Sequence, residues 1–333
     1  MLKDRIAKFR TYFQPFDVRH GLICAPGQAG CLIYGLITHD TLTAAIAAGT
    51  AFSIGMGLRR YRQARSLAGA VALMAVAALI GSLTAGQFAV YLGLAAMFAA
   101  ACASLALIDE DIWWVSLEST IALLLSSQFP SGTDEAIHRA IIVVIAGGFQ
   151  MVLILILDRL VPRSEPKAEP QTPIPPTKRA LTTYGLIAGV SVATAIAAAH
   201  WLHLDRAYWA GMTALIILKP RFQLTQQRGF ERLLGNVVGC SLATALTFVL
   251  PQNGWIDLVL CVGGAAASYG LLRARYAAFS LAVSFTAVML LYAAHVSALH
   301  GSEQRVLATL LGGLISIAVM WLASKTIARH FAI

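Results

Sequence analysis

The sequence predicts an all-α, polytopic membrane protein with about twelve transmembrane helices built as two parallel six-helix repeats. Hydrophobic residues make up 58% of the chain and charged residues only 12%, roughly half the charged share of a soluble domain. Apolar stretches recur at near-regular intervals between short basic or Gly/Pro turns, as expected of segments that cross a hydrocarbon core about 30 Å thick. Short motifs also recur at one spacing in the two halves of the chain.

The expected spans follow one another along the whole chain. Several are shorter than the roughly 20 residues of a straight crossing, so tilting or partial spanning is left open for them, and whether the first and eighth spans cross fully is open. The spans are 20–37, 42–58, 67–85, 88–107, 112–129, 139–158, 181–201, 206–219, 233–250, 255–272, 276–294 and 305–324.

The basic residues alternate between the two sides that these spans create. Of the 25 Lys and Arg residues, 22 fall on one side and only Arg139, Arg206 and Arg305 on the other. By the positive-inside rule, we expect the crowded side and both termini to be cytoplasmic, in the cell inner membrane. The net charge of +9 then indicates contact with anionic membrane lipid, and we expect no nucleic-acid partner.

Two segments are not expected to span. Residues 1–19 form a cytoplasmic amphipathic arm, in which basic residues interleave with apolar ones at helical spacing, and this pattern does not fit a cleavable signal. Residues 162–179 form a proline-rich cytoplasmic linker, because they contain five of the eleven prolines and cannot be helical throughout. These segments delimit two six-helix repeats, 20–161 and 180–333.

Four short matches indicate an internal duplication. They occur in the same order at offsets of 164 to 167 residues: Gly21-Leu-Ile with Gly185-Leu-Ile, Asp40 with Asp205, Arg65 with Arg232, and Arg139 with Arg305. Each half holds an even number of spans, so the repeats are expected to be parallel, about an axis along the membrane normal. We expect a binding site at their interface, an architecture typical of transporters and channels.

One stretch of the second half resembles a known family. It comprises Tyr208-Trp209-Ala210, then Leu218-Lys219-Pro220, then Arg232-Leu-Leu-Gly235-Asn236-Val-Val-Gly239. It is similar to the hallmark of the fusaric acid resistance family of inner-membrane exporters, which is grouped with the aromatic acid exporters. Asn236 stands where threonine is usual, and the similarity covers roughly 184–250. The first half agrees only through the internal repeat.

The resemblance implies a substrate class. It implies export of aromatic acids and makes Tyr208 and Trp209 candidates for substrate binding. Longer relatives carry a large soluble domain where this chain has only the proline-rich linker, so functions of that domain are not expected here. A more distant likeness to the plant aluminium-activated malate transporters, which are anion channels, implies an anionic substrate without fixing the mechanism.

Arg139 and Arg305 are the main candidates for substrate binding. They are equivalent in the two repeats and lie on the side that other basic residues avoid. Two guanidinium groups related by the repeat axis could hold one carboxylate bidentately. The alternative is that each side chain extends to the outer surface beside Glu135 or Glu303.

Glu118 is the candidate for proton coupling. It lies about six residues inside an expected span, where low dielectric favours a protonatable carboxyl. A structural glutamate, neutral or paired, is the alternative.

Pro26 and Gly27 are candidates for a helix break in the first span, with Gln28 beside them as a further substrate-binding candidate. Proline removes a backbone hydrogen bond, and exposed backbone in a membrane must face protein or a cavity. A simple proline kink is the alternative.

The remaining features favour structural roles. The five cysteines lie in apolar segments without metal-site spacing, and Gly235, Gly239, Gly263, Gly264, Gly312 and Gly313 suit close helix packing. The outer histidines, including His200 and His295, could suit a metal site, but interfacial histidines are common. We expect no metal, no cofactor and no enzymatic activity, because nucleotide-binding and hydrolase motifs are absent from the sequence.

The sequence therefore supports a secondary transporter that exports organic carboxylate anions, with aromatic acids as the favoured class and proton coupling as an option. A passive organic-anion channel on the same scaffold, and a non-transporting membrane scaffold or an enzyme using the outer histidines, are the alternatives. A homo-oligomer or a periplasmic adaptor is left open as a partner.

Overall fold

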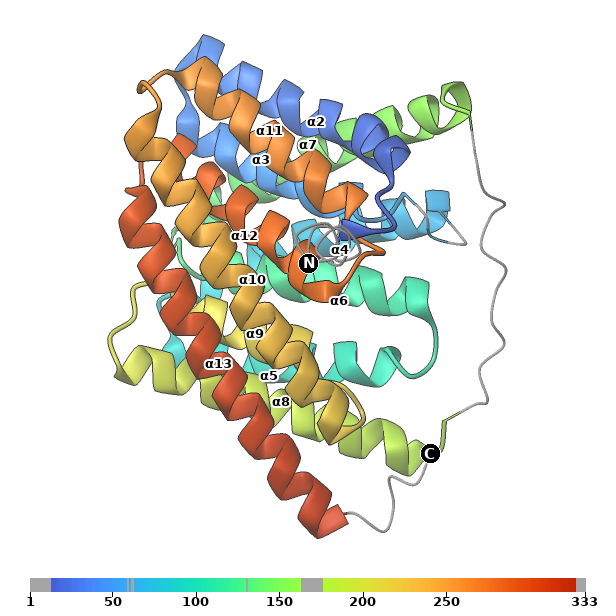
Figure 1. The fold of residues 1–333 in the computed structure, drawn as a ribbon. Helices are drawn as coiled ribbons and strands as arrows, with labels where there is room; N and C mark the ends of the chain where they lie inside the picture. The colour runs from blue at the N-terminus through green and yellow to red at the C-terminus, as the bar shows by residue number, and fades with distance from the viewer. Residues whose placement is uncertain (1–12, 59, 61–62, 130, 163–175, 328–333) are drawn as a thin grey trace, which may run out of the picture. The chain divides into compact units, whose positions relative to one another are not determined.

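The computed structural model describes residues 13–58, 60, 63–129, 131–162 and 176–327, which contain twelve α-helices and no strand (Figure 1). Most of the expected arm and most of the linker lie outside these residues. The helices are α2 (Val18–Thr38), α3 (Thr41–Gly55), α4 (Gln63–Thr84), α5 (Phe88–Leu105), α6 (Glu110–Ser126), α7 (Thr133–Leu160), α8 (Lys178–Trp201), α9 (Tyr208–Ile217), α10 (Phe222–Val249), α11 (Gly254–Gly270), α12 (Tyr276–Ala293) and α13 (Ala298–Ile327).

Side chains placed before the helices fix several of their starts. Asp40 and Asp109 accept hydrogen bonds from the backbone N–H of Thr43 and Ile112, and Asn253 does the same for Trp255. Such caps satisfy amide groups that the first turn leaves without a partner. The helices therefore begin at polar residues just outside the apolar stretches.

Eight of the described helices are long and apolar enough to cross a membrane. The others are shorter: α3 has 15 residues, α6 and α11 have 17 each, and α9 has 10. At 1.5 Å per residue, α9 is only about 15 Å long, half the thickness of a hydrocarbon core. The chain is thus a multi-pass membrane protein, whereas twelve complete crossings and the two-repeat arrangement remain predictions.

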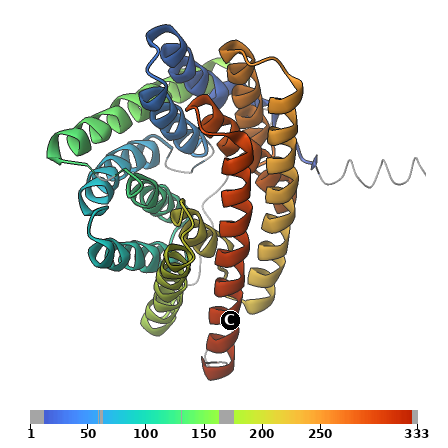
Figure 2. The ribbon, with the colours of Figure 1, turned by 90° about the vertical axis from the view of Figure 1, so that its left-hand side faces the viewer.

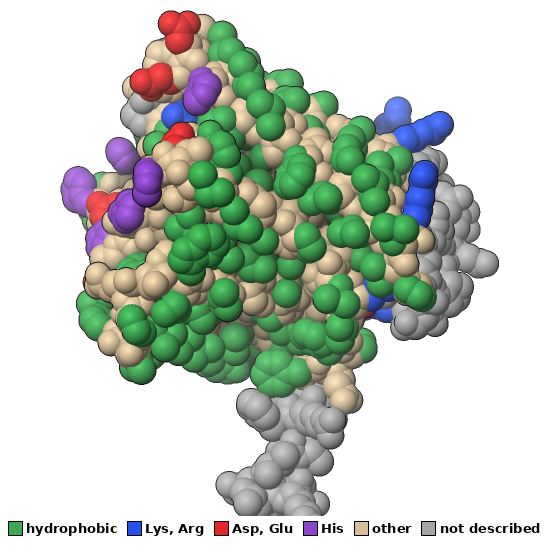
Figure 3. Space-filling view, turned by 90° about the horizontal axis from the view of Figure 1, so that it is seen from above, with side chains coloured by type: hydrophobic (Ala, Val, Ile, Leu, Met, Phe, Trp, Pro, Cys, Tyr) green, Lys and Arg blue, Asp and Glu red, His purple; other side chains and the backbone are tan. Residues whose placement is uncertain are grey.

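The surface fits a membrane environment. Many large apolar side chains are exposed, among them Phe248 at 74% and Val259 at 66%, and a soluble monomer rarely exposes so much contiguous apolar surface. On the face seen in Figure 3, Lys and Arg side chains gather at one edge, Asp, Glu and His gather at the opposite edge, and hydrophobic side chains fill the space between. A band of this kind is what lipid tails require.

The chain forms two compact units that do not follow the two halves of the sequence. Unit 1 comprises residues 1–59, 145–166 and 231–306, and unit 2 comprises 60–144, 167–230 and 307–333. Three of the five unit boundaries fall inside helices, in α7, α10 and α13. Each unit therefore takes helices from both 20–161 and 180–333, and the assignment of these halves as repeats remains a prediction about the sequence.

Within unit 1, α2 packs against α3 and α11, and α12 packs against α11 and α3. The parts of α10 and α13 in this unit run side by side (Figures 1 and 2) and are joined by hydrogen bonds of Ser302 to Thr244 and to the Cys240 carbonyl. Within unit 2, α4 packs against α6, α5 against α6 and α8, and α9 against α8 and α6.

Small residues allow these helices to approach closely. An added Cβ on Gly81 of α4 would lie 2.5 Å from the Leu123 carbonyl oxygen of α6, and one on Gly235 of α10 would lie 2.5 Å from that of Ala277 of α12. The expected packing role is confirmed at Gly235, and also at Gly239, Gly264 and Gly312, whereas Gly263 faces open space.

Candidate functional site

Arg305, on α13 of unit 1, is buried, with only 4% of its surface exposed. Its Nε donates to Oδ1 of Asn236 on α10 at 3.3 Å. The hydroxyl of Ser284 on α12 donates to the same oxygen. Asn236 is completely buried and thus orients the guanidinium from one side, while α12 supports Asn236 from the other.

A second buried arginine lies one helical turn before Asn236. Arg232 is 4% exposed, its Nη1 donates to the hydroxyl of Tyr276 at 2.9 Å, and its carbonyl accepts from Ser280 at 3.2 Å. Its Nε–H is buried without an acceptor among the described residues. A buried charged donor left in this state is costly, so an acceptor oxygen from a bound anion would stabilise it.

The spacing of the motif explains how α10 presents these groups. Residues four apart lie on one helical face, and Arg232 and Asn236 are such a pair. Gly235 and Gly239 let the α12 backbone approach, since a Cβ on either would overlap backbone atoms of α12. The close approach brings Ser280 and Ser284 within reach of α10.

The sequence reasoning missed the α12 partners of this site. Tyr276, Ser280 and Ser284 recur every four residues in a largely apolar helix, which places them on one face. That polar stripe is visible in the sequence and was the available signal.

Arg139, on α7, belongs to unit 2. Its Nη1 donates to the hydroxyl of Ser82, to the carbonyl of Phe129 and to the hydroxyl of Ser131, and its guanidinium lies 5.0 Å from the Phe129 ring centre. Arg139 is thus held by groups near the start of α7. Binding of one carboxylate by both Arg139 and Arg305 remains a prediction.

Glu118 lies in the middle of α6 in unit 2 and is 5% exposed. Two other carboxyl groups of the described residues, those of Asp111 and Asp158, are also buried. Asp158 forms an ion pair with Arg19 at 2.7 Å. Burial fits the expected environment of a proton carrier, but the coupling role stays a prediction.

The helix break expected at Pro26 and Gly27 is absent, because α2 runs continuously through both residues. The space beside Gly27 is filled by the amide of Gln150, which donates to the Cys24 carbonyl at 2.9 Å. Gln28 is completely buried, and its amide lies 3.5 Å from Sγ of Cys261. Pro26 itself is exposed on the surface of α2, and the helix continues through it although proline donates no backbone hydrogen bond.

Tyr208 and Trp209 open α9 and are 2% and 4% exposed. Their ring centres are 5.4 Å apart, and the Arg206 guanidinium lies 5.6 Å from the Trp209 ring. The structure thus places these two candidates in the interior of unit 2, whereas Gln28, Arg232, Asn236 and Arg305 lie in unit 1.

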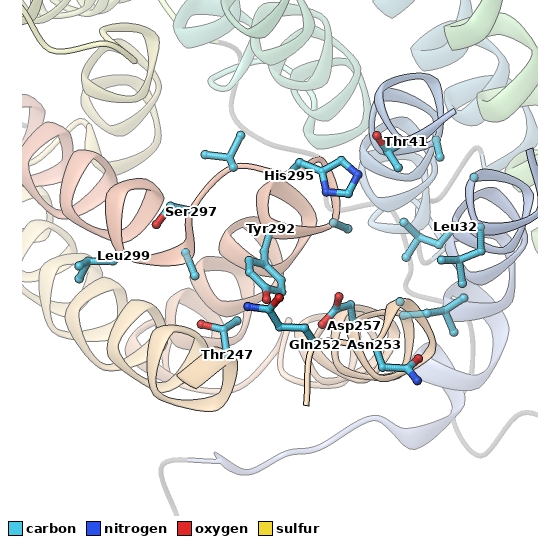
Figure 4. Close-up of a pocket in the computed structure, with 18 of the residues that line it drawn as sticks. Leu32, Thr41, Thr247, Gln252, Asn253, Asp257, Tyr292, His295, Ser297 and Leu299 are labelled. Carbon is cyan, nitrogen blue, oxygen red and sulfur yellow. The ribbon is translucent and has the colours of Figure 1, made fainter. Parts of the chain in front are cut away.

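Unit 1 also contains a hollow of about 640 Å³ between the ends of α2, α10, α11 and α12 (Figure 4). Figure 4 shows Tyr292, Gln252 and Asp257 close together on one side and His295 beside Thr41 on another. Among the described residues, Asp257 is its one acidic lining side chain, and no Lys or Arg lines it. An organic anion would meet no cation there, so this hollow is a weaker candidate than the arginines.

Among the described residues, no group of three or more His, Cys, Asp or Glu side chains could hold a metal ion. The described cysteines are all free and buried. The polar groups that the site offers are the guanidinium groups of Arg232 and Arg305, the Asn236 amide, and the hydroxyls of Tyr276, Ser280 and Ser284.

Comparisons with known proteins agree with the resemblance. Residues 193–319 match the family model described as fusaric acid resistance protein-like, a segment that includes Arg232, Asn236 and Arg305 and extends beyond the expected 184–250. A 126-residue stretch is 32% identical to the uncharacterized protein YhfK of Escherichia coli (strain K12), covering 36% of this chain and 17% of that protein. No solved structure matches the chain.

Proposed function

Since residues 193–319 match the family model described as fusaric acid resistance protein-like, we propose that this membrane protein exports organic carboxylate anions, with aromatic acids as the preferred class. The observation that carries the proposal is the pair of buried arginines at the family motif. Arg232 and Arg305 are each 4% exposed, and Arg232 has a buried Nε–H without an acceptor in the described part of the chain.

Two buried guanidinium groups favour an anionic ligand on physical grounds. A cation removed from water is destabilising unless an opposite charge or several acceptors replace its hydration. A carboxylate supplies two acceptor oxygens in the geometry that a guanidinium prefers. Asn236 accepts a hydrogen bond from Arg305, and Tyr276 accepts one from Arg232. These contacts orient both guanidinium groups, so the ligand completes a site that is largely formed.

We place the site in the inner membrane with both termini in the cytoplasm, on the basis of the 22-to-3 distribution of basic residues. Arg139 occupies the position in the first repeat that Arg305 occupies in the second. In this proposal, Arg139 and Arg305 both contribute to anion binding. Gln28, Tyr208 and Trp209 are its secondary contacts.

Export of an anion from a negative interior is favourable without further coupling. One charge releases about 2.3 kcal/mol per 100 mV, enough for a gradient of about 50-fold. Exchange for an entering proton doubles the energy and raises the gradient to about 2,000-fold. Buried Glu118 is the proposed proton carrier.

The test is efflux from liposomes that contain the purified full-length protein, at a clamped potential, with a panel of aromatic and aliphatic carboxylates. We expect aromatic carboxylates to leave fastest and Arg232→Gln to slow them. Lys325→Gln serves as control, because it removes an exposed cation from α13. No flux of any carboxylate by the wild type would refute the function, and flux without proton dependence would refute proton coupling.

A further inference from the structure

A second set of cations and aromatic rings lies in unit 2, at the start of α6. The ammonium of Lys219 lies 5.6 Å from the ring centre of Trp113. The Arg60 guanidinium lies 6.0 Å from the Trp113 ring and 5.5 Å from the Trp114 ring. At these distances the ring faces attract the cations.

The backbone around Lys219 is held in place. Lys219 follows the short helix α9, and the Thr225 hydroxyl accepts from its N–H at 2.9 Å and donates to its carbonyl at 3.0 Å. The preceding carbonyl, of Leu218, accepts from the hydroxyl of Tyr184 at 3.1 Å. Lys219 is therefore positioned by a fixed connection between α9 and α10.

The two cations of this set differ in their electrostatic balance. Arg60 forms an ion pair with Glu110 at 2.8 Å. Lys219 has no carboxylate partner among the described residues; the groups that face it are Arg228 on α10 and the Cys102 thiol on α5. Burial, and then the positive charge of Arg228, lower the pKa of Lys219 to about 8. The negative charge of an anion beside Lys219 would offset both the burial and the repulsion by Arg228, because it favours the protonated ammonium.

Trp114 adds an independent indication of a ligand. It is 2% exposed, and its indole Nε1–H is buried without an acceptor in the part of the chain that the structure describes. An indole nitrogen can only donate, and a buried donor without a partner is costly. Within the described residues, the cluster thus combines a cation lacking a counter-charge, a donor lacking an acceptor, and two large aromatic surfaces.

We propose that Lys219, Trp113 and Trp114 form a binding site for an aromatic carboxylate on the side of the membrane where α6 begins. The carboxylate pairs with the Lys219 ammonium and accepts from an indole N–H, and the ligand's ring packs against Trp113. The proposal rests on the proposed function, in which this site of unit 2 collects the anion from the cytoplasm.

The experiment measures equilibrium binding of benzoate to the purified full-length protein by calorimetry, with cyclohexanecarboxylate and benzylamine for comparison. With a pKa of about 8, about nine-tenths of Lys219 is protonated at pH 7 and about a tenth at pH 9. We expect benzoate affinity at this site to fall about tenfold over that range. Lys219→Gln should abolish it at both pH values, whereas Lys219→Arg should bind equally at pH 7 and pH 9.

Lys325→Gln is a matched control, because Lys325 also lies over a tryptophan, 4.1 Å from the Trp321 ring, but is exposed at the end of α13. Its affinity and pH profile should equal those of the wild type. Wild-type binding in Lys219→Gln, preference for benzylamine, or binding of phosphatidylglycerol in place of benzoate would overturn the site.

Efflux measured on the same preparations separates this site from the proposed function. Active wild-type efflux with unchanged benzoate binding in Lys219→Gln would refute the site alone. Binding that depends on Lys219 without any efflux would refute the function alone. Lys219→Arg guards against misfolding, because it keeps the positive charge and should retain benzoate binding while losing the pH dependence.

Discussion

Replacing Gly235 by alanine should loosen the contact between α10 and α12. The added Cβ would lie 2.5 Å from the Ala277 carbonyl oxygen, 2.7 Å from Cβ of Ser280 and 2.8 Å from the Leu281 nitrogen. Ordinary contacts begin at 3.4 Å, so the helices must separate locally by about 0.9 Å. Two of the three atoms belong to the backbone and cannot rotate away.

The magnitude follows from two opposing effects. Overpacking a tight interface costs about 1 to 3 kcal/mol, and two backbone contacts place Gly235 toward the upper end. Alanine gains about 1 kcal/mol over glycine in helix propensity. The net loss of stability is therefore about 1 to 2 kcal/mol, or a fall of roughly 2 to 8 °C in melting temperature.

The assay is thermal unfolding of the purified protein in detergent, with Gly263→Ala as matched control. Gly263 lies in α11 of the same unit, and its added Cβ meets nothing within 4 Å, so this variant should melt at or above the wild-type temperature. Equal melting temperatures for the two variants would refute the close-contact account of Gly235.

Three further predictions concern coupling, the motif and topology. Glu118→Gln should abolish the acceleration of efflux by an inward proton gradient while potential-driven flux persists, and an unchanged proton response would remove Glu118 from the mechanism. Asn236→Ala should weaken benzoate binding roughly 3- to 10-fold by releasing Arg305, whereas Asn236→Thr, which restores the residue usual in the family, should recover most of the affinity; equal affinities in both variants would contradict an orienting role. A reporter inserted within residues 168–172, outside the described residues, should give a cytoplasmic signal, and a periplasmic one would contradict the topology.

Helix positions were largely predictable, because apolar stretches of membrane length leave few alternatives. The expected helix bounds were wrong where a helix has a polar end. The span expected at 233–250 belongs to a helix that begins at Phe222. Its first turns are rich in Gln and Arg, so hydropathy does not reveal them. The span expected at 206–219 is only the ten residues Tyr208–Ile217, because the extended backbone at Leu218 ends the helix.

Helix pairing was not predictable from the same patterns. Repeated motifs show which segments correspond but not which segments touch, and the structure packs α5 against α8 and α11 against α2, each pair joining the two halves of the sequence. Contacts of this kind depend on surfaces that come together only in three dimensions.

The candidate site was predictable in part. Arg305 was selected by its charge in an apolar helix, and Asn236 by its place in the motif, but their contact depends on the relative register of α10 and α13. Gln28 was selected through the expected break in α2. Because Gly27 accommodates Gln150, the helix stays continuous, and Gln28 lies in the packed interior.

The central claim is that Arg305 and Arg139 bind the carboxylate, and equilibrium binding of benzoate at pH 9, where Lys219 is mostly neutral, tests it most directly. Arg305→Gln and Arg139→Gln should each weaken binding by about 10- to 150-fold, corresponding to the loss of one charge-assisted contact of about 1.5 to 3 kcal/mol. Lysine should rescue only in part, since it lacks the planar fork, and the double variant should lose less than the sum of the single losses. Wild-type affinity in both glutamine variants would contradict the account.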